Sequence, residues 1–410
     1  MLKPAPLPAP EVKTSYARLS LSYFFLFAAW ACVTPFFVLY LQSLGFSGAQ
    51  IGVLTGIGPL IGLAAKPFWA GYADATNRHR FVLYVAVVAA VVLNAIFPFL
   101  RSFSLILGVQ ILMALVSSHT LPLLDSATIH MMGSNRDRYG SVRLWGTVAW
   151  GLVSALAGFV LDRLGLASMF WIFCGLMSVN LFLLRSLEFE ENPERGTYFT
   201  KVGRLLREPQ WLLFLGTVLV AGIGSTAHDY MPLLMQELPG VSRWLPFAVS
   251  GVALVGIAIT ISTISETPIM AGSHWFLRTL GSRGALYLSM LAMAVRCFIY
   301  AKAATPDQAL LIQLMHGITY PLMWVAGIKF VAEMAPRGLS STAQGLFSAM
   351  FMGIGTALGY YLCGLLIDKV GVFSMYTVVG WVVLVCQVLS VLLSLLFSRR
   401  KSQPVSAGAA

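Results

Sequence analysis

The 410-residue sequence predicts an all-α membrane protein, with twelve transmembrane helices in two pseudo-symmetric bundles of six. Three observations predict this fold class: long apolar runs, few charged residues and an internal repeat. Hydrophobic residues make up 58% of the chain and charged residues 10%, whereas soluble domains average about 25% charged residues. Since backbone groups in lipid must be satisfied internally, these long, non-alternating runs predict helices rather than barrel strands.

The apolar runs are long enough for a bilayer, which needs about 20 apolar residues per helix. They are interrupted by a polar segment, 188–208, that carries nine charged residues. We therefore predict an N-terminal six-helix bundle (1–187), a cytoplasmic linker (188–208) and a C-terminal six-helix bundle (209–410). The predicted helices cover residues 17–42, 49–73, 81–100, 104–131, 143–161, 167–187, 210–235, 244–271, 285–303, 307–334, 341–367 and 373–397.

The repeat supports the division into halves. The segment GFVLDRLGLASMF (158–170) returns as GLLIDKVGVFSMY (364–376), 206 residues later. The end of the fifth predicted helix therefore matches the end of the eleventh. Such a repeat at long range is typical of a chain built from two related units.

The basic residues predict the orientation in the membrane. Of the 27 lysines and arginines, 18 fall on the side of the N-terminus and five on the opposite side. Because cytoplasmic segments are enriched in lysine and arginine, we predict that both termini are cytoplasmic. The net charge of +11 is spread between the apolar runs, so we expect a lipid bilayer and no nucleic acid as partner. The short loops favour a bacterial inner membrane, and we expect a monomer.

Motifs for catalysis are not found in the sequence. It lacks a P-loop, an H-E-x-x-H zinc motif and a G-x-S-x-G nucleophile motif. The five cysteines lie singly inside apolar runs, which argues against a disulfide framework or a metal site. We therefore predict that the protein is not an enzyme and holds no cofactor.

Several charged side chains fall deep inside predicted helices, where they are costly unless they face the interior and find partners. The clearest is Arg296 in MLAMAVRCFIY (290–300), a stretch with no other charge. We expect Glu266 to balance it, together with Asp229, and His316 to lie nearby. A carboxylate that loses such a partner can take up a proton, so this cluster is a candidate for proton coupling.

Other polar residues in the predicted helices have more than one interpretation. His228 and Asp229 in the seventh helix, and Asp125 and Arg143 in the fourth and fifth, are candidates for binding a polar solute. Lys66 and Lys329 lie near helix ends, where long side chains can reach the membrane interface.

Two stretches carry a family resemblance, PFFVLYLQSLGFSGAQIGVLTGIGPLIG (35–62) and LSSTAQGLFSAMFMGIGTALG (339–359). With the six-plus-six organisation, they resemble the oligosaccharide/proton symporter branch of the major facilitator superfamily, typified by lactose permease, and its phenylpropionate-permease and nucleoside-symporter relatives. The resemblance covers nearly the whole chain. It implies the major facilitator fold and a secondary transporter driven by a proton gradient, with a small-molecule substrate.

The resemblance also implies residue roles. Asp125, Arg143 and Trp150 reproduce the 18- and seven-residue intervals of the carboxylate, arginine and tryptophan that bind sugar in lactose permease. Arg296 and His316 reproduce a 20-residue interval in the ninth and tenth helices, and Glu266 lies in the eighth helix, where the family has a carboxylate for substrate and proton coupling. One departure is Thr319, where the family has a proton-carrying carboxylate.

The loop GYADATNRHR (71–80) is similar to a superfamily loop between the second and third helices. The resemblance implies that Asp74, with Arg78 or Arg80, closes the cytoplasmic side. The predicted substrate is a sugar, a nucleoside or an aromatic acid. A drug or metabolite efflux pump of the same fold, and a receptor or scaffold that does not transport, remain alternatives.

Overall fold

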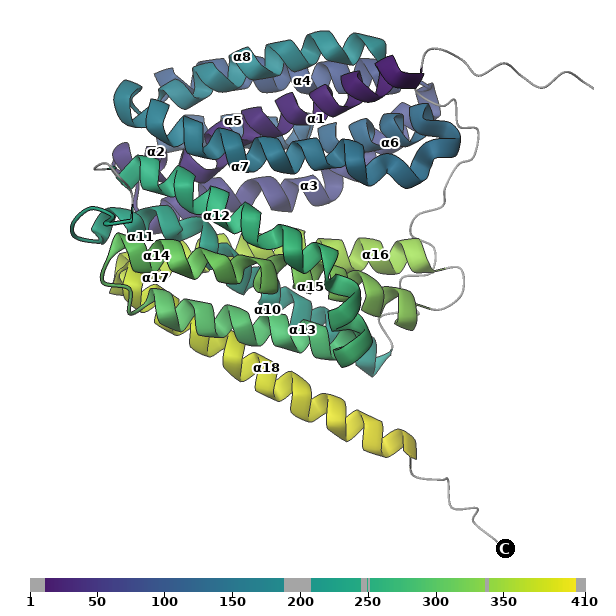
Figure 1. Ribbon diagram of the computed structural model, residues 1–410, viewed down its shortest axis with the longest axis vertical. Coiled ribbons are helices and arrows are strands. Elements are labelled where there is room, and N and C mark those ends of the chain that lie inside the picture. The colour runs from purple at the N-terminus through teal and green to yellow at the C-terminus, as the bar shows by residue number, and fades with distance from the viewer. Residues whose placement is uncertain (1–11, 188–207, 245–248, 250, 336–338, 403–410) are drawn as a thin grey trace, which may run out of the picture.

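The computed structural model describes residues 12–187, 208–244, 249, 251–335 and 339–402. The described chain is helical, and Figure 1 shows the helices as two bundles lying one against the other. Residues 188–207 of the predicted linker lie outside the described residues, so the domain boundaries stay a prediction.

The first bundle contains six spans. Four are single or kinked helices, and two are made from two shorter helices in sequence. The helices are α1 (Val12–Val33) with α2 (Phe37–Ser43), α3 (Gly48–Thr76), α4 (His79–Ile96), α5 (Phe103–Ser117) with α6 (Thr120–Met132), α7 (Tyr139–Leu164) and α8 (Ser168–Leu183).

The second bundle repeats this arrangement. Its helices are α10 (Pro209–Thr226) with α11 (Met231–Glu237), α12 (Gly251–Ala271), α13 (Ser273–Tyr300), α14 (Pro306–Ile312) with α15 (His316–Met334), α16 (Ser340–Ser348) leading into α17 (Thr356–Val370), and α18 (Val372–Ser402). Within the described residues, eleven spans have the length and apolar composition to cross a membrane, and α8 is a shorter apolar helix. The prediction of a twelve-helix membrane protein is confirmed.

One boundary differs clearly from the prediction. The ninth span was expected to begin at residue 285, but α13 already begins at Ser273. Gly281, with a φ of +69° and a ψ of 172°, a conformation open to glycine, is not helical and separates a short helix before it from the span that follows. The polar stretch before the ninth span is therefore helical rather than a loop.

Two spans in each half are interrupted at corresponding places. The first span breaks at Thr34–Phe36 and the seventh at Ala227–Tyr230. The fourth breaks after Ser117 and the tenth at Gln313–Met315. Irregular backbone at membrane depth is tolerated where it is buried in protein or lines a cavity. These four breaks therefore mark where polar cavities are expected.

The two halves are closely packed at one end, called here the closed end. The start of α3 lies against α17, where a side chain on Gly48, Gly52 or Gly364 would collide with the opposing backbone. The second contact joins α7 to α12, where Gly158 faces Ala253 and Gly256 faces the backbone of Ser154. Small residues let helix backbones approach this closely in membrane proteins.

A carboxylate strengthens the closed end. Asp368, at the end of α17, accepts backbone hydrogen bonds from Gly48 (2.5 Å) and Ala49 (2.7 Å) at the start of α3. A negative charge at a helix N-terminus is favourable because it meets free N–H groups and the positive end of the helix dipole. Asp368, part of the repeated D-[RK]-x-G sequence, thus ties the two halves together.

The opposite end, called the open end, is less closely joined. Figure 1 shows the ribbons of the halves converging near α2 and α11 and diverging toward the start of α16. Glycine contacts across the halves stop near the middle of α3, where Gly353 meets Leu63, and Gly71 further along has nothing within 4 Å. The described glycine contacts between the halves are therefore concentrated toward the closed end.

Candidate functional site

A cavity of about 580 Å³ lies between the two halves, below the closed end. Helices of both halves line it: α1, α7, α10, α12, α13, α15 and α17. Its volume falls within the 300–1,000 Å³ range of small-molecule sites. It contains most of the embedded charged residues that the sequence singles out, including Arg143, Asp229, Glu266 and Arg296.

The wall from the first half is aromatic and carries one arginine. The Arg143 guanidinium carbon lies 4.1 Å from the ring centroid of Phe27, and Trp150 packs edge-on against the same ring at 6.5 Å. Arg143 makes no hydrogen bond or ion pair with a described residue. Its donors are therefore free for a ligand. Trp150 lies on the same helix, seven residues further along α7.

Gly146 makes this stacking possible. A Cβ atom at Gly146 would lie 2.8 Å from both the Arg143 guanidinium and the Phe27 ring. A side chain there would push the arginine out of its place over the ring. The sequence YGSVRLWGTVAWG thus contains a glycine that positions the arginine three residues before it.

Asp125 is held away from the cavity. Its Oδ1 accepts hydrogen bonds from the hydroxyls of Tyr23 (2.6 Å) and Tyr139 (2.9 Å), and it does not line the cavity or pair with Arg143. The predicted trio of Asp125, Arg143 and Trp150 is therefore only partly brought together, because two tyrosines take up the carboxylate. A substrate-binding role for Asp125 stays a prediction.

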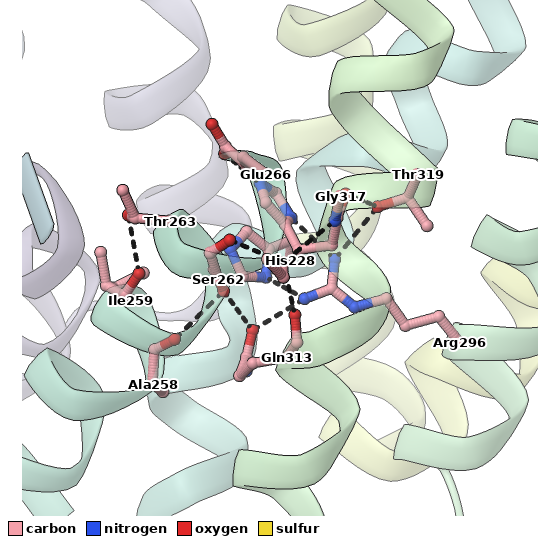
Figure 2. A network of polar contacts seen from close by, with 12 residues as sticks. His228, Ala258, Ile259, Ser262, Thr263, Glu266, Arg296, Gln313, Gly317 and Thr319 are labelled. Atoms are coloured by element: carbon pink, nitrogen blue, oxygen red, sulfur yellow. Dashed lines mark hydrogen bonds and ion pairs between the residues drawn. The ribbon is translucent and has the colours of Figure 1, made fainter. Parts of the chain in front are cut away.

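The wall from the second half is built around Arg296, which is only 5% exposed. Figure 2 shows its guanidinium among residues of α15 and of the breaks in the seventh and tenth spans, among them Thr319, His228 and Gln313. Nη1 donates to His316 Nδ1 (2.9 Å) and Thr319 Oγ1 (3.4 Å). Nη2 donates to Gln313 Oε1 (2.8 Å), His228 Nδ1 (3.1 Å) and the Tyr300 hydroxyl (3.4 Å).

This geometry assigns the histidine tautomers. A guanidinium only donates, so the Nδ1 atoms of His228 and His316 must be acceptors and the ring protons sit on Nε2. His316 Nε2 lies 3.0 Å from Glu266 Oε1, to which it donates. Arg296, His316 and Glu266 therefore form a chain in which a neutral imidazole joins the cation to the carboxylate.

The expected direct ion pair between Arg296 and Glu266 is wrong. His316 lies between the two groups, and Arg296 pairs directly with no described carboxylate. Asp229 is not a direct partner either, because its Oδ2 accepts from the Tyr360 hydroxyl at 2.7 Å. Neutral acceptors compensate the guanidinium instead, which is physically adequate because hydrogen bonds to charged groups are the stronger ones.

Residues that sequence reasoning missed complete this cluster. Gln313 links Arg296 to Tyr300, whose hydroxyl lies 2.5 Å from Gln313 Nε2, and Ser262 donates to the same glutamine oxygen. Tyr300 is four residues after Arg296, a spacing that places both side chains on one helix face. The four-residue spacing could have identified Tyr300 as a partner of Arg296. The apolar residues around Gln313 gave no sign that it belongs to the cluster.

The residues expected to close the cytoplasmic side do not form the expected pair. Asp74 lies 2.8 Å from His79 Nε2, and Arg80 donates to the Leu187 carbonyl at 2.5 Å. The turn explains this, since Asn77 takes a left-handed φ of +51°, ends α3 and lets α4 begin with His79. Among the described residues, Asp74 contacts neither Arg78 nor Arg80, so the gating role of this trio stays a prediction.

Twelve membrane helices in two related bundles, with a charged cavity between them, define a solute transporter rather than an enzyme. The model of the MFS_1 like family matches residues 16–378, and the chain belongs to this family. The protein is a secondary transporter of the major facilitator superfamily, as the resemblance implied.

Three comparisons place it further. The maltose permease of Geobacillus stearothermophilus is 26% identical over 384 residues, which cover 93% of this chain and 94% of the permease. The probable 3-phenylpropionic acid transporter of Escherichia coli K12 is 24% identical, covering 86% of this chain and 91% of the relative. The solved nucleoside transporter NupG shares the fold, with a TM-score of 0.82 at 16% identity over 92% of this chain and 98% of that one.

Proposed function

We propose that this protein is a proton-coupled secondary transporter of a small ring-bearing solute: a sugar, a nucleoside or an aromatic acid. The cavity between the halves carries the proposal, because it presents an unpaired arginine and an indole on one side and a charged relay on the other. A guanidinium suits hydroxyl or carboxylate groups, and an aromatic face suits a ring. Relatives include permeases for maltose and raffinose and the transporters for nucleosides and 3-phenylpropionic acid.

Alternating access would use the two ends of the molecule. If both termini are cytoplasmic, as the basic residues predict, the open end faces the cytoplasm and this is an inward-facing arrangement. The closed end, with its glycine contacts and Asp368, would then separate on the other side of the membrane. Bacterial relatives support placement in a bacterial inner membrane. The expected monomer stays a prediction.

Glu266 is the proposed coupling acid. Its side chain is 30% exposed and lines the cavity, while one oxygen is hydrogen-bonded to His316. Protonation of Glu266 would replace a charge-assisted hydrogen bond with a weaker neutral one and loosen the tie between α12 and α15. Thr319 accepts a weak bond from Arg296 at 3.4 Å and donates to the His316 carbonyl at 2.9 Å, so the carboxylate found there in the family has no counterpart at that position.

The first experiment is a thermal-shift screen of purified protein against sugars, nucleosides and aromatic acids. A ligand at 100 times its dissociation constant should stabilise the protein by about 2.7 kcal/mol. We expect one class to shift the wild type and the control Arg163→Ala, which alters an exposed arginine at the closed end of α7. The shift should be lost in Arg143→Ala. A shift that survives in Arg143→Ala would contradict the site.

The second experiment tests coupling in proteoliposomes. Glu266→Gln should abolish accumulation driven by a pH gradient and retain counterflow exchange, because the glutamine keeps the shape of the site but cannot release a proton. Glu333→Gln, which removes a carboxylate paired with Lys329 at 3.7 Å, is the matched control. Unimpaired accumulation in Glu266→Gln would exclude this residue as the coupling acid.

The alternatives give different outcomes in the same assays. A drug or metabolite efflux pump would bind none of the three classes and would respond to apolar compounds. A receptor or scaffold that does not transport would bind a ligand without moving it, and Arg296→Gln would leave its function intact while the protein still folds.

A further inference from the structure

A second cavity of about 560 Å³ is lined mainly by the first half of the molecule, beside the breaks in the first and fourth spans, and also by Asp229, Met352 and Tyr360 of the second half. The second half uses its corresponding breaks, in the seventh and tenth spans, to hold the Arg296 cluster. The corresponding breaks of the two halves thus each lie beside a cavity. The two cavities also meet, since both are lined by Trp30, Thr34, Pro59, Asp229, Met352 and Tyr360.

The walls of this second cavity, called the N-chamber, are mainly apolar. They include phenylalanine, valine and methionine side chains of α2, α4, α5 and α8, with Phe97, Phe170 and Met177 among them. A few polar side chains interrupt them, notably Asn94 and Gln110. An apolar cleft with few convergent polar groups is the usual composition of a small-molecule site.

Lys66 brings a positive charge into the N-chamber. It lies ten residues before the end of α3, about 15 Å along the helix axis, which is far for a side chain to reach the nearby interface. Its side chain points back along the helix, because the position of a Cβ on Gly62 would be 3.9 Å from Lys66 Nζ. Lys66 lines the N-chamber, and the expectation that it reaches the membrane interface stays a prediction.

The Lys66 ammonium is unpaired within the described part of the chain. The other described charged side chain of the N-chamber is Asp229, which accepts its hydrogen bond from Tyr360. Beside Lys66 lies Ser118, whose Cβ is 3.8 Å from the same Gly62 position and whose buried hydroxyl has no hydrogen-bond partner. A cation and a buried hydroxyl thus lie close to Gly62, on a wall that also includes Ser117 and Thr120.

We propose that Lys66 is the anion-binding subsite for a transported organic acid, whose apolar or aromatic body occupies the N-chamber. The side chain of Lys66 is exposed in the cleft, so its ammonium is open to a ligand. A carboxylate would pair with this ammonium by a charge-assisted hydrogen bond, while the phenylalanine-rich walls would cover the rest of the solute. This proposal rests on the proposed transport function and narrows its substrate class.

The test uses a series of aryl and alkyl carboxylates, each with its neutral amide, in binding measurements on purified full-length protein. The wild type should bind at least one acid about tenfold more tightly than its amide, as expected for one charge-assisted contact of roughly 1.4 kcal/mol. Lys66→Gln should bind the acid and amide equally, and Lys66→Arg should keep the preference. Lys329→Gln, which removes a lysine that pairs with Glu333 outside both cavities, should also keep it.

Two results would overturn the subsite. The first is an acid preference that persists in Lys66→Gln, and if it disappears in Arg143→Ala the anion binds in the main cavity. The second is a wild type that prefers no acid over its amide. Neither result touches the transport function, which fails separately when wild-type proteoliposomes move no solute, acidic or neutral.

Discussion

The two halves of this transporter treat their embedded arginines in opposite ways. Arg143 in the first half stacks on Phe27 and has no hydrogen bond to a described residue, although Asp125 is one helix away. Arg296 in the second half is hydrogen-bonded to five neutral side chains and joined to Glu266 through His316.

These two arrangements suit different tasks in the proposed transport cycle. A stacked arginine keeps its donors for a ligand, so the first half is suited to binding. A saturated arginine has little left for a ligand, but a proton added to or removed from its network changes several bonds at once, so the second half is suited to coupling. Variants in each half test this contrast.

Arg296 should be the most sensitive position. Arg296→Gln leaves buried acceptors without their donor, and we expect transport to fall at least 100-fold and the free energy of unfolding by about 1–3 kcal/mol. Arg296→Lys should not rescue transport, because an ammonium cannot reproduce the planar fork that serves five acceptors. Initial uptake rates and thermal unfolding measure both effects. Near wild-type uptake by Arg296→Lys would show that charge alone suffices.

In the first half, binding and stability should separate. Arg143→Ala should weaken ligand binding at least tenfold with little change in unfolding temperature, because the arginine has no described polar partner. Asp125→Asn should do the reverse, since it weakens two bonds to tyrosines, with a loss of about 1–3 kcal/mol in stability and less than a threefold change in affinity. Titration and thermal unfolding of both variants decide this. Loss of binding in a stable Asp125→Asn variant would restore its substrate-binding role.

The closed end should depend on one member of the repeated aspartate pair. Asp368→Asn should shift the population toward opening of that end, because the charged partner of the α3 N-terminus is lost, by about 0.5–2 kcal/mol. Asp162→Asn, at the equivalent place in the first half, is the control, since Asp162 is exposed and makes no bond to a described residue. Spin-label distances across the closed end measure the shift. Equal shifts in both variants would contradict the assignment to Asp368.

Thr319 should matter least. Its hydroxyl is 3.4 Å from Arg296 Nη1 and also donates to the His316 carbonyl. Serine and threonine commonly make such a bond to a carbonyl one helical turn earlier. Thr319→Ala should change uptake less than twofold and stability by at most about 1 kcal/mol. A loss of accumulation comparable with that of Glu266→Gln would instead show that the threonine takes part in coupling.

Much of the site could be predicted from sequence because embedded charges are rare and must face the interior. Arg143, Trp150, His228, Asp229, Glu266, Arg296 and His316 all line the cavity between the halves. Their partners could not be predicted in the same way. These partners depend on which helices face each other. Examples are the tyrosines that bind Asp125, the glutamine beside Arg296 and the direction of Lys66. An apolar run of sequence does not show which of its faces packs against which neighbour.

The sequence alone was enough to predict that this is a membrane protein, how many helices span the membrane and that the two halves are related by a repeat. These follow from composition and from local periodicity, since a bilayer accepts only long apolar helices and a repeat must build related units. Only the tertiary structure decided how the charges are compensated. Compensation is a property of contacts between distant helices, and here a histidine came to lie between the arginine and the carboxylate that the sequence had suggested as direct partners.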